Sequence, residues 1–161
     1  MTWYRCITKK ALPKEGPTLA ELPMAKVFNE TGIGTMNTSL GDIDKNAMLS
    51  FRSSSYGSTS HALANQNAFN TFYGGKAIIY SSGHRTGFTD DHCMYSYRNT
   101  RAHNSILVNG MTQKIGTEGY GWIPRWYEGE KIAYMVGDAS NAYGEVISPL
   151  WLARGRDSGL E

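Results

Sequence analysis

The chain has no long apolar run and no block of like charges. None of its hydrophobic stretches approaches the roughly 20 residues that cross a bilayer, and its first residues lack the apolar segment of a signal peptide. The Lys and Arg residues are dispersed, and the formal net charge is +2. The composition therefore provides no basic footprint for nucleic acid or membrane surfaces. If the natural protein is exported, we expect its signal to lie outside this chain.

Cysteine and the common nucleotide or hydrolase motifs are also scarce. Cys6 and Cys93 lie far apart and have no CxxC spacing, so they fit two free thiols and do not reveal the redox compartment. The sequence has no Gly-rich phosphate loop that opens a helix and no GxSxG elbow. Nucleotide-binding and serine-hydrolase functions therefore have little support.

What is present favours one mainly β domain. The 161 residues, 40% of them hydrophobic, are enough for a single core but not for two full domains. The 18 glycines and 10 tyrosines favour turns and pleated surfaces, and no stretch of about 12 residues has a helical period. We expect an arm or linker over 1–23, a domain over 24–159 that stops before it is complete, and vector-derived residues at 160–161.

Two regions have a clear strand pattern. Apolar and polar side chains alternate over residues 47–52, which is typical of a half-buried strand whose polar face can flank a cleft. Residues 67–73 and 76–80 flank Gly74-Gly75, which predicts a tight hairpin. The other expected elements are a strand over 103–108 closed by a turn at Asn109-Gly110, a strand over 131–136, and a long loop over 116–129.

His61 begins the segment that is richest in candidate site residues. In an extended chain His61, Leu63, Asn65 and Asn67 point the same way, so an imidazole and two amides would line one wall of a polar site. Histidine can donate, accept or carry charge near neutral pH. The plainer alternative is a histidine at a strand end that is satisfied by the backbone.

His103 stands in a second segment of similar character. Its neighbour Arg101 either clamps a carboxylate with two hydrogen bonds or pairs with Asp90 or Asp91. His84 and His92 add further imidazoles, so a metal site with His103 is an alternative, but the spacing matches no zinc pattern.

Aromatic residues provide the remaining candidates. Tyr97, like Tyr80 and Tyr95, is either a proton donor or base near these histidines or a half-buried strand residue. Trp122, with Trp126 and Tyr127, offers flat faces for sugar rings, although packing at a domain interface explains these aromatics equally well.

Five stretches together resemble the C-terminal β-domain of heparinase II/III-like polysaccharide lyases over roughly residues 24–150. They are Ser50-Phe51-Arg52-Ser53-Ser54, Tyr56-Gly57-Ser58, His61-Ala62-Leu63-Ala64-Asn65-Gln66-Asn67-Ala68-Phe69, Ser82-Gly83 and Thr100-Arg101-Ala102-His103-Asn104-Ser105-Ile106-Leu107-Val108-Asn109-Gly110. The resemblance implies an antiparallel β-sandwich that in the family follows an α/α toroid. It also implies cleavage of uronate-containing polysaccharide by β-elimination in the cleft between the two. The toroid, which in the family supplies a Tyr, an Asn and a His, is not in this chain.

The resemblance also bears on metal binding. The family motif commonly reads His-Gly-His-x-Asp-x-x-Ser-Phe, and its first histidine, which lies close to the substrate, falls on His61. The three zinc ligands of several members fall on Leu63, Ser81 and His103. Leu cannot coordinate and a neutral Ser is a poor substitute for Asp, so we expect no metal cofactor.

We therefore expect a fragment of a secreted or periplasmic polysaccharide lyase, inactive alone, that supplies one wall of the cleft. Its partners would be an acidic polysaccharide, the missing toroid and, through open sheet edges, a second copy. The expected site residues are His61 and His103 as catalytic groups and Asn65, Gln66, Tyr97, Arg101 and Trp122 as substrate-binding groups. The alternatives are a non-catalytic carbohydrate-binding or structural β-domain and a metal-dependent hydrolase built on His84, His92 and His103.

Overall fold

The structure is a computed structural model that describes residues 16–58, 61–82 and 90–143. Two of the expectations, the free thiol at Cys6 and the imidazole of His84, lie outside these residues, as do the expected end of the domain and the residues at 160–161. The elements in chain order are η1 (Leu19–Glu21), β1 (Ala25–Phe28), β2 (Ile33–Asn37), η2 (Ile43–Lys45), β3 (Ala47–Arg52), β4 (Ala68–Tyr73), β5 (Lys76–Ile79), η3 (Cys93–Tyr97), η4 (Thr100–Ala102), β6 (Trp122–Glu128), β7 (Ala133–Asp138) and η5 (Ser140–Tyr143). Within these residues, no helix is long and apolar enough to cross a membrane.

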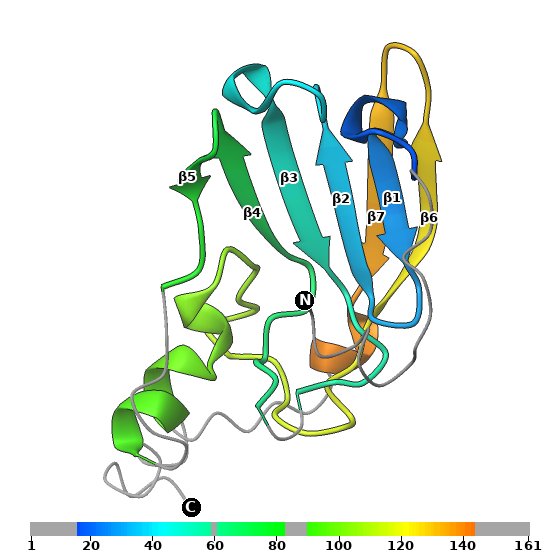
Figure 1. Ribbon diagram of the computed structural model, residues 1–161. Helices are drawn as coiled ribbons and strands as arrows, with labels where there is room; N and C mark the ends of the chain where they lie inside the picture. Colours follow the sequence, from blue (N-terminus) through cyan, green and yellow to red (C-terminus); the bar gives the residue numbers. More distant parts are fainter. Residues whose placement is uncertain (1–15, 59–60, 83–89, 144–161) are drawn as a thin grey trace, which may run out of the picture.

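The first five strands form one antiparallel sheet in chain order (Figure 1). The register places Leu49 of β3 opposite Met36 of β2 and Thr71 of β4. Successive side chains of a strand point to opposite faces, so these three share one face of the sheet. The predicted strand over 47–52 is confirmed with the same bounds.

The predicted hairpin is confirmed as β4 and β5. Both linking glycines have positive φ, 53° at Gly74 and 73° at Gly75, as the primed turn that suits two-residue hairpins requires. The register shifts between Thr71 and Phe72, and β5 ends one residue earlier than predicted. Glycine is needed at this turn because other residues rarely adopt such φ values.

The long loop predicted over 116–129 is wrong, because β6 occupies its second half. β6 pairs antiparallel with β7 in a separate two-stranded sheet. Pro124 falls where the register shifts between Trp122 and Arg125, and a strand tolerates proline at such an irregularity. β7 confirms the strand predicted over 131–136, displaced by two residues toward the C-terminus.

The strand predicted over 103–108 is also wrong. The segment follows η4 as irregular chain, and within it only Val108 forms a bridge, with Met111. Asn104 instead bonds to the start of β4, since Phe69 N–H donates to the Asn104 carbonyl at 3.2 Å and the Asn104 side chain donates to the Phe69 carbonyl at 2.9 Å. The turn at Asn109-Gly110 is present, with φ of 54° and 73°.

The two sheets stack, which confirms the β-sandwich expected from the sequence. In Figure 1 β7 runs behind β1 and β2, and β6 lies beyond it at the right edge. Gly34 of β2 has no side chain, and an added Cβ would lie 2.3 Å from the Met135 sulfur of β7. A Cβ on Gly137 would lie 2.5 Å from the Phe51 ring. Glycine thus allows the close approach of the two layers.

A short helical segment before residue 98 was not predicted. It ends as the π-helix η3, and the Asp90 carboxylate accepts a hydrogen bond of 2.9 Å from the Cys93 N–H. An aspartate three residues before an otherwise unbonded N–H is a typical helix-start signal. Cys93 is buried as a free thiol.

Candidate functional site

The two histidine-bearing segments lie side by side next to the end of β3 and the start of β4. Ala64 N–H donates to the Arg98 carbonyl at 3.0 Å, and the Thr100 hydroxyl donates to the Ala64 carbonyl at 2.7 Å. The Ser105 hydroxyl donates to the Gln66 carbonyl at 2.7 Å. Segments about forty residues apart in sequence therefore form one polar region.

His103 is the most constrained imidazole of this region. It is 8% exposed, and its Nε2 lies 3.0 Å from the Tyr97 carbonyl. A carbonyl only accepts, so Nε2 carries the proton and Nδ1 keeps a lone pair. Among the described residues, buried Nδ1 has no hydrogen-bond partner.

The pKa of His103 is lowered from its ordinary value. Desolvation by burial is the largest cause, and the positive charge of Arg52 adds to it, whereas the bond to Tyr97 acts in the opposite direction. His103 is therefore neutral at pH 7. The unpaired lone pair on Nδ1 of a neutral imidazole can accept a proton or a hydrogen bond from a group that reaches it.

Arg52 extends from the end of β3 into the same region. Its guanidinium donates through Nη1 to Asn65 Oδ1 and through Nη2 to the Gly57 carbonyl, at 3.2 Å in the second case. Desolvation by burial lowers the pKa of Arg52. The polar face of this strand was expected to flank a cleft, but Arg52 was not among the expected site residues. The sequence feature that could have identified Arg52 is its place as the last polar residue in the alternating pattern of residues 47–52.

The expected single wall of His61, Leu63, Asn65 and Asn67 is wrong, because the segment is not extended. Asn65 N–H donates to the Leu63 carbonyl at 2.9 Å, which closes a three-residue turn. Asn67 has a φ of 57° and donates to the Gly137 carbonyl at 3.1 Å. His61 is exposed, and Asn65 accepts from Arg52.

Gln66 lies beneath the surface. Its side chain is fully buried, accepts from the Ser54 N–H at 2.7 Å and donates to the Gly119 carbonyl at 2.9 Å. In this arrangement Gln66 supports the polar region from below, and its amide has no exposed surface to offer a substrate.

The other expected substrate-binding residues divide between two places. Tyr97 is half-buried, bonds to His103 through its carbonyl and has its ring edge-on to His92, with centroids 4.6 Å apart. Arg101 is exposed, and its backbone N–H donates to Asn99. Trp122 is 39% exposed, and its ring stacks on that of Tyr120 with centroids 5.6 Å apart. Together with Val27 and Ser55 it lines a separate cavity of about 230 Å³.

The side chains at the zinc-ligand positions do not fit that metal. Leu63 has no donor atom, and Ser81 bonds to Asn70 Oδ1 through its N–H at 2.9 Å and its hydroxyl at 3.4 Å. His103 alone retains a suitable ligand atom. In the described part of the chain, no three His, Cys, Asp or Glu side chains are grouped to hold a metal, so the hydrolase alternative gains nothing from these residues.

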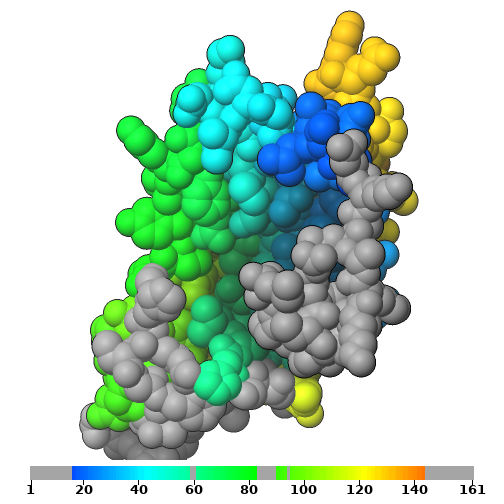
Figure 2. Space-filling model, viewed as in Figure 1, coloured from blue at the N-terminus to red at the C-terminus, as the bar shows by residue number. Residues whose placement is uncertain are grey.

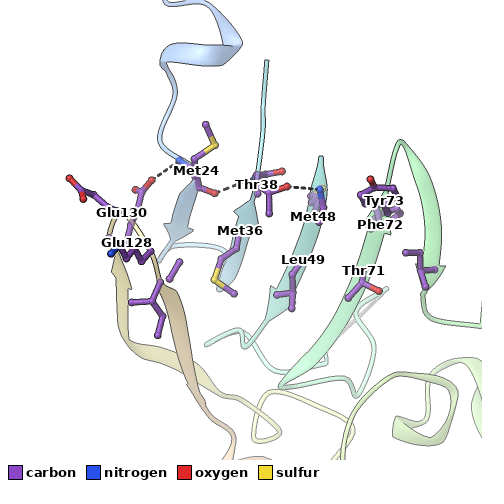
Figure 3. A pocket seen from close by; sticks show the side chains of 17 residues that line it. Met24, Met36, Thr38, Met48, Leu49, Thr71, Phe72, Tyr73, Glu128 and Glu130 are labelled. Carbon is purple, nitrogen blue, oxygen red and sulfur yellow. Dashed lines mark hydrogen bonds between the residues drawn. The ribbon is translucent and has the colours of Figure 1, made fainter. Parts of the chain in front are cut away.

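A larger groove lies between the sheets at the other end of β3. It encloses about 710 Å³ between the first residues of β3 and the tip of the β6–β7 hairpin, where Met24 N–H donates to Glu128 at 2.7 Å (Figure 3). Its walls are mainly apolar and include Met36, Leu49 and Ile132. The groove is separate from the histidine region, because Arg52 stands at the opposite end of the strand.

Comparison with known proteins agrees with this architecture. The family model described as "Heparinase II/III-like, C-terminal" matches residues 20–145. The chain belongs to this family. A search of curated proteins finds no matching sequence.

Two solved structures of a heparinase III gene product share the fold. One, with methylated lysines, is 17% identical and superposes with a TM-score of 0.58, and the other is 18% identical with a TM-score of 0.59. Each match covers 71% of this chain, but only 17% and 18% of the respective heparinase chains. This chain therefore corresponds to less than a fifth of those proteins.

Proposed function

We propose that this chain supplies one wall of the substrate cleft in a polysaccharide lyase that cleaves uronate-containing chains by β-elimination. The observation that carries the proposal is the association of the two histidine segments, in which neutral His103 lies near the cation Arg52 and exposed His61 stands at the entrance of one segment. The family supports the class of enzyme.

The chemistry requires a base, an acid and neutralisation of a carboxylate. A base removes the proton from C5 of the uronate, the electron pair forms the C4–C5 double bond, and the bond from C4 to the glycosidic oxygen breaks. That oxygen leaves with a proton from an acid. Donors that bind the uronate carboxylate lower the barrier, because they stabilise the enolate-like charge that forms at C5.

The residues of this chain would serve on the carboxylate side of that reaction. The imidazole of His61 is exposed, and Asn65 presents an amide beside Arg52. The toroid of the family supplies the remaining catalytic groups, so we propose that the 161 residues alone are inactive.

The test is the rise in ultraviolet absorbance from the unsaturated uronate product. The longer protein that joins this domain to a toroid would be assayed on heparan, chondroitin, alginate and ulvan-type substrates. A rise on one of them supports β-elimination and names the substrate class. No rise on any of the four contradicts the proposal for these polysaccharides.

A non-catalytic carbohydrate-binding domain is the second candidate. It is favoured by the exposed Trp122, which stacks on Tyr120 and presents a flat face of the kind on which sugar rings pack. Elimination that survives replacement of both His61 and His103 would support this alternative against the first.

A further inference from the structure

Arg52 is a half-buried cation that forms no ion pair with a carboxylate of the described residues. The one salt bridge among the described residues joins Lys45 to Asp42, and the two groups that Arg52 contacts are an amide oxygen and a backbone carbonyl. His103, whose pKa the charge of Arg52 lowers, is neutral at pH 7. A buried charge is costly unless it is paired.

The guanidinium is oriented by two hydrogen bonds, but some of its N–H donors have no partner among the described residues. Two of its five N–H donors bind Asn65 and Gly57. Nε of Arg52 has no hydrogen-bond partner among the described residues and is not one of their buried unpartnered polar atoms, so its N–H reaches solvent. Arg52 therefore presents at least one N–H donor, on a guanidinium that Asn65 and Gly57 orient, at the surface.

The loops around Arg52 are also held by backbone hydrogen bonds that do not involve its charge. Ser58 N–H donates to the Gly116 carbonyl at 2.9 Å, and Ala64 N–H donates to the Arg98 carbonyl at 3.0 Å. A neutral side-chain amide also has two N–H donors. What a guanidinium adds is charge and a planar fork that matches a carboxylate in two parallel bonds.

We propose that Arg52, oriented by Asn65 and Gly57, binds the carboxylate of the uronate and makes this wall of the cleft selective for acidic sugars. The inference rests on the proposed function for its substrate class, but it concerns binding and not elimination. Asn65 is then a positioning residue for Arg52, because its oxygen already accepts from the guanidinium.

Isothermal titration of the 161-residue chain tests this directly. The probes are a non-sulfated uronate-containing tetrasaccharide, its carboxyl-reduced counterpart, and the carboxyl-reduced form with a sulfate ester. We expect carboxyl reduction to weaken binding at least about tenfold, the usual scale of a charge-assisted pair. Absent binding, equal binding of the acidic and neutral probes, or tighter binding of the sulfated probe overturns the proposal.

Two variants and a control assign the effect to Arg52. In Arg52→Gln the acidic and neutral probes should bind alike. Asn65→Asp keeps an acceptor for the guanidinium but places a competing carboxylate there, so binding of the acidic probe should be about tenfold weaker. The melting temperature of this variant should be unchanged or higher. Arg125→Gln removes an exposed arginine of β6 and should leave both affinities unchanged. An acidic preference that persists in both variants overturns the proposal.

The two proposals can fail separately. An Arg52-dependent preference for the carboxylate without any elimination by the longer protein supports the binding site and contradicts the lyase. Elimination with an unchanged KM in Arg52→Gln supports the lyase and contradicts the role of Arg52.

Discussion

The side chain of Gln113 bonds to both backbone groups of Gln66. Gln66 N–H donates to Oε1 of Gln113 at 2.7 Å, and Nε2 of Gln113 donates to the Gln66 carbonyl at 2.9 Å. Both side chains are fully buried. Because the side chain of Gln66 in turn holds Ser54 and Gly119, this pair joins segments from three parts of the chain beneath the histidine region.

Replacing Gln113 by Leu should therefore destabilise the domain strongly. The variant keeps most of the side-chain volume but leaves the N–H and carbonyl of Gln66 buried without these partners. We expect the free energy of unfolding to fall by about 3 kcal/mol, measured by urea denaturation. Asn29→Ala, at an exposed turn position, is the control and should change stability by less than about 0.5 kcal/mol. A loss below about 1 kcal/mol in Gln113→Leu would show that the pair is dispensable.

The turn between β1 and β2 approaches residue 53 closely at Gly32, and Gly110 provides a matched control glycine without such a contact. Both have positive φ, 66° and 73°, but a Cβ on Gly32 would lie 2.2 Å from the Ser53 carbonyl oxygen, whereas a Cβ on Gly110 meets nothing within 4 Å. Gly110→Ala should cost about 1 kcal/mol for its backbone conformation. Gly32→Ala should cost at least about 2 kcal/mol more, because backbone must move. Equal melting temperatures for the two variants would contradict this.

The burial of His103 should make stability depend on pH. Its pKa is lowered in the folded state, so the unfolded chain binds the proton more readily below the ordinary value of about 6.5. The contribution to stability is complete above that pH and is lost as the pH falls toward the folded-state pKa. In urea titrations from pH 5 to 8, wild type should therefore lose more stability on acidification than His103→Gln. A constant difference between the two proteins over this range would refute the assignment.

The sequence predicted the strands whose pattern is local. Alternation over 47–52 and the Gly74-Gly75 pair are sufficient for β3 and for the β4–β5 hairpin, because pleat and turn geometry depend on adjacent residues. β6 was missed because its glycine and tryptophan content suggested a loop. Its pairing with β7 depends on partners that no local window contains.

The candidate site was predicted in outline and not in detail. The motifs brought His61, His103 and Asn65 into one hypothesis, and the structure joins their segments. Alternation could not place Gln66, since the chain turns at Asn65 and Asn67 and the expected wall is lost. Arg52 was missed because its position beside Asn65 follows from the fold and not from spacing.

His61→Ala in the longer protein should reduce turnover at least about a hundredfold, as expected for loss of a positioned acid or base. The measurement is the ultraviolet rate at saturating substrate. His92→Ala, another exposed histidine, is the control and should retain normal turnover. Near-normal turnover in His61→Ala would return His61 to a structural role.

The β5 edge should mediate association of the 161-residue chain. β5 is the last strand of its sheet as described, and Ile78 and Ile79 on it are 61% and 43% exposed. Unpaired strand edges template pairing with another chain, so light scattering should show mass rising above the monomer with concentration. Ile78→Lys should restore the monomer, whereas Ile106→Lys, in an exposed segment outside the strands, should not. A monomeric mass for wild type at high concentration would contradict the prediction.

The interior of the described domain is composed largely of hydrogen-bonding groups. Its largest fully buried side chains are those of Gln66, Gln113, Asn99 and Thr100. Exposing apolar surface raises the heat capacity on unfolding, whereas exposing polar surface lowers it. The stability curve of this domain should therefore be flatter with temperature than that of a Leu- and Ile-filled domain of equal length, and its resistance to cold should exceed what its melting temperature alone suggests.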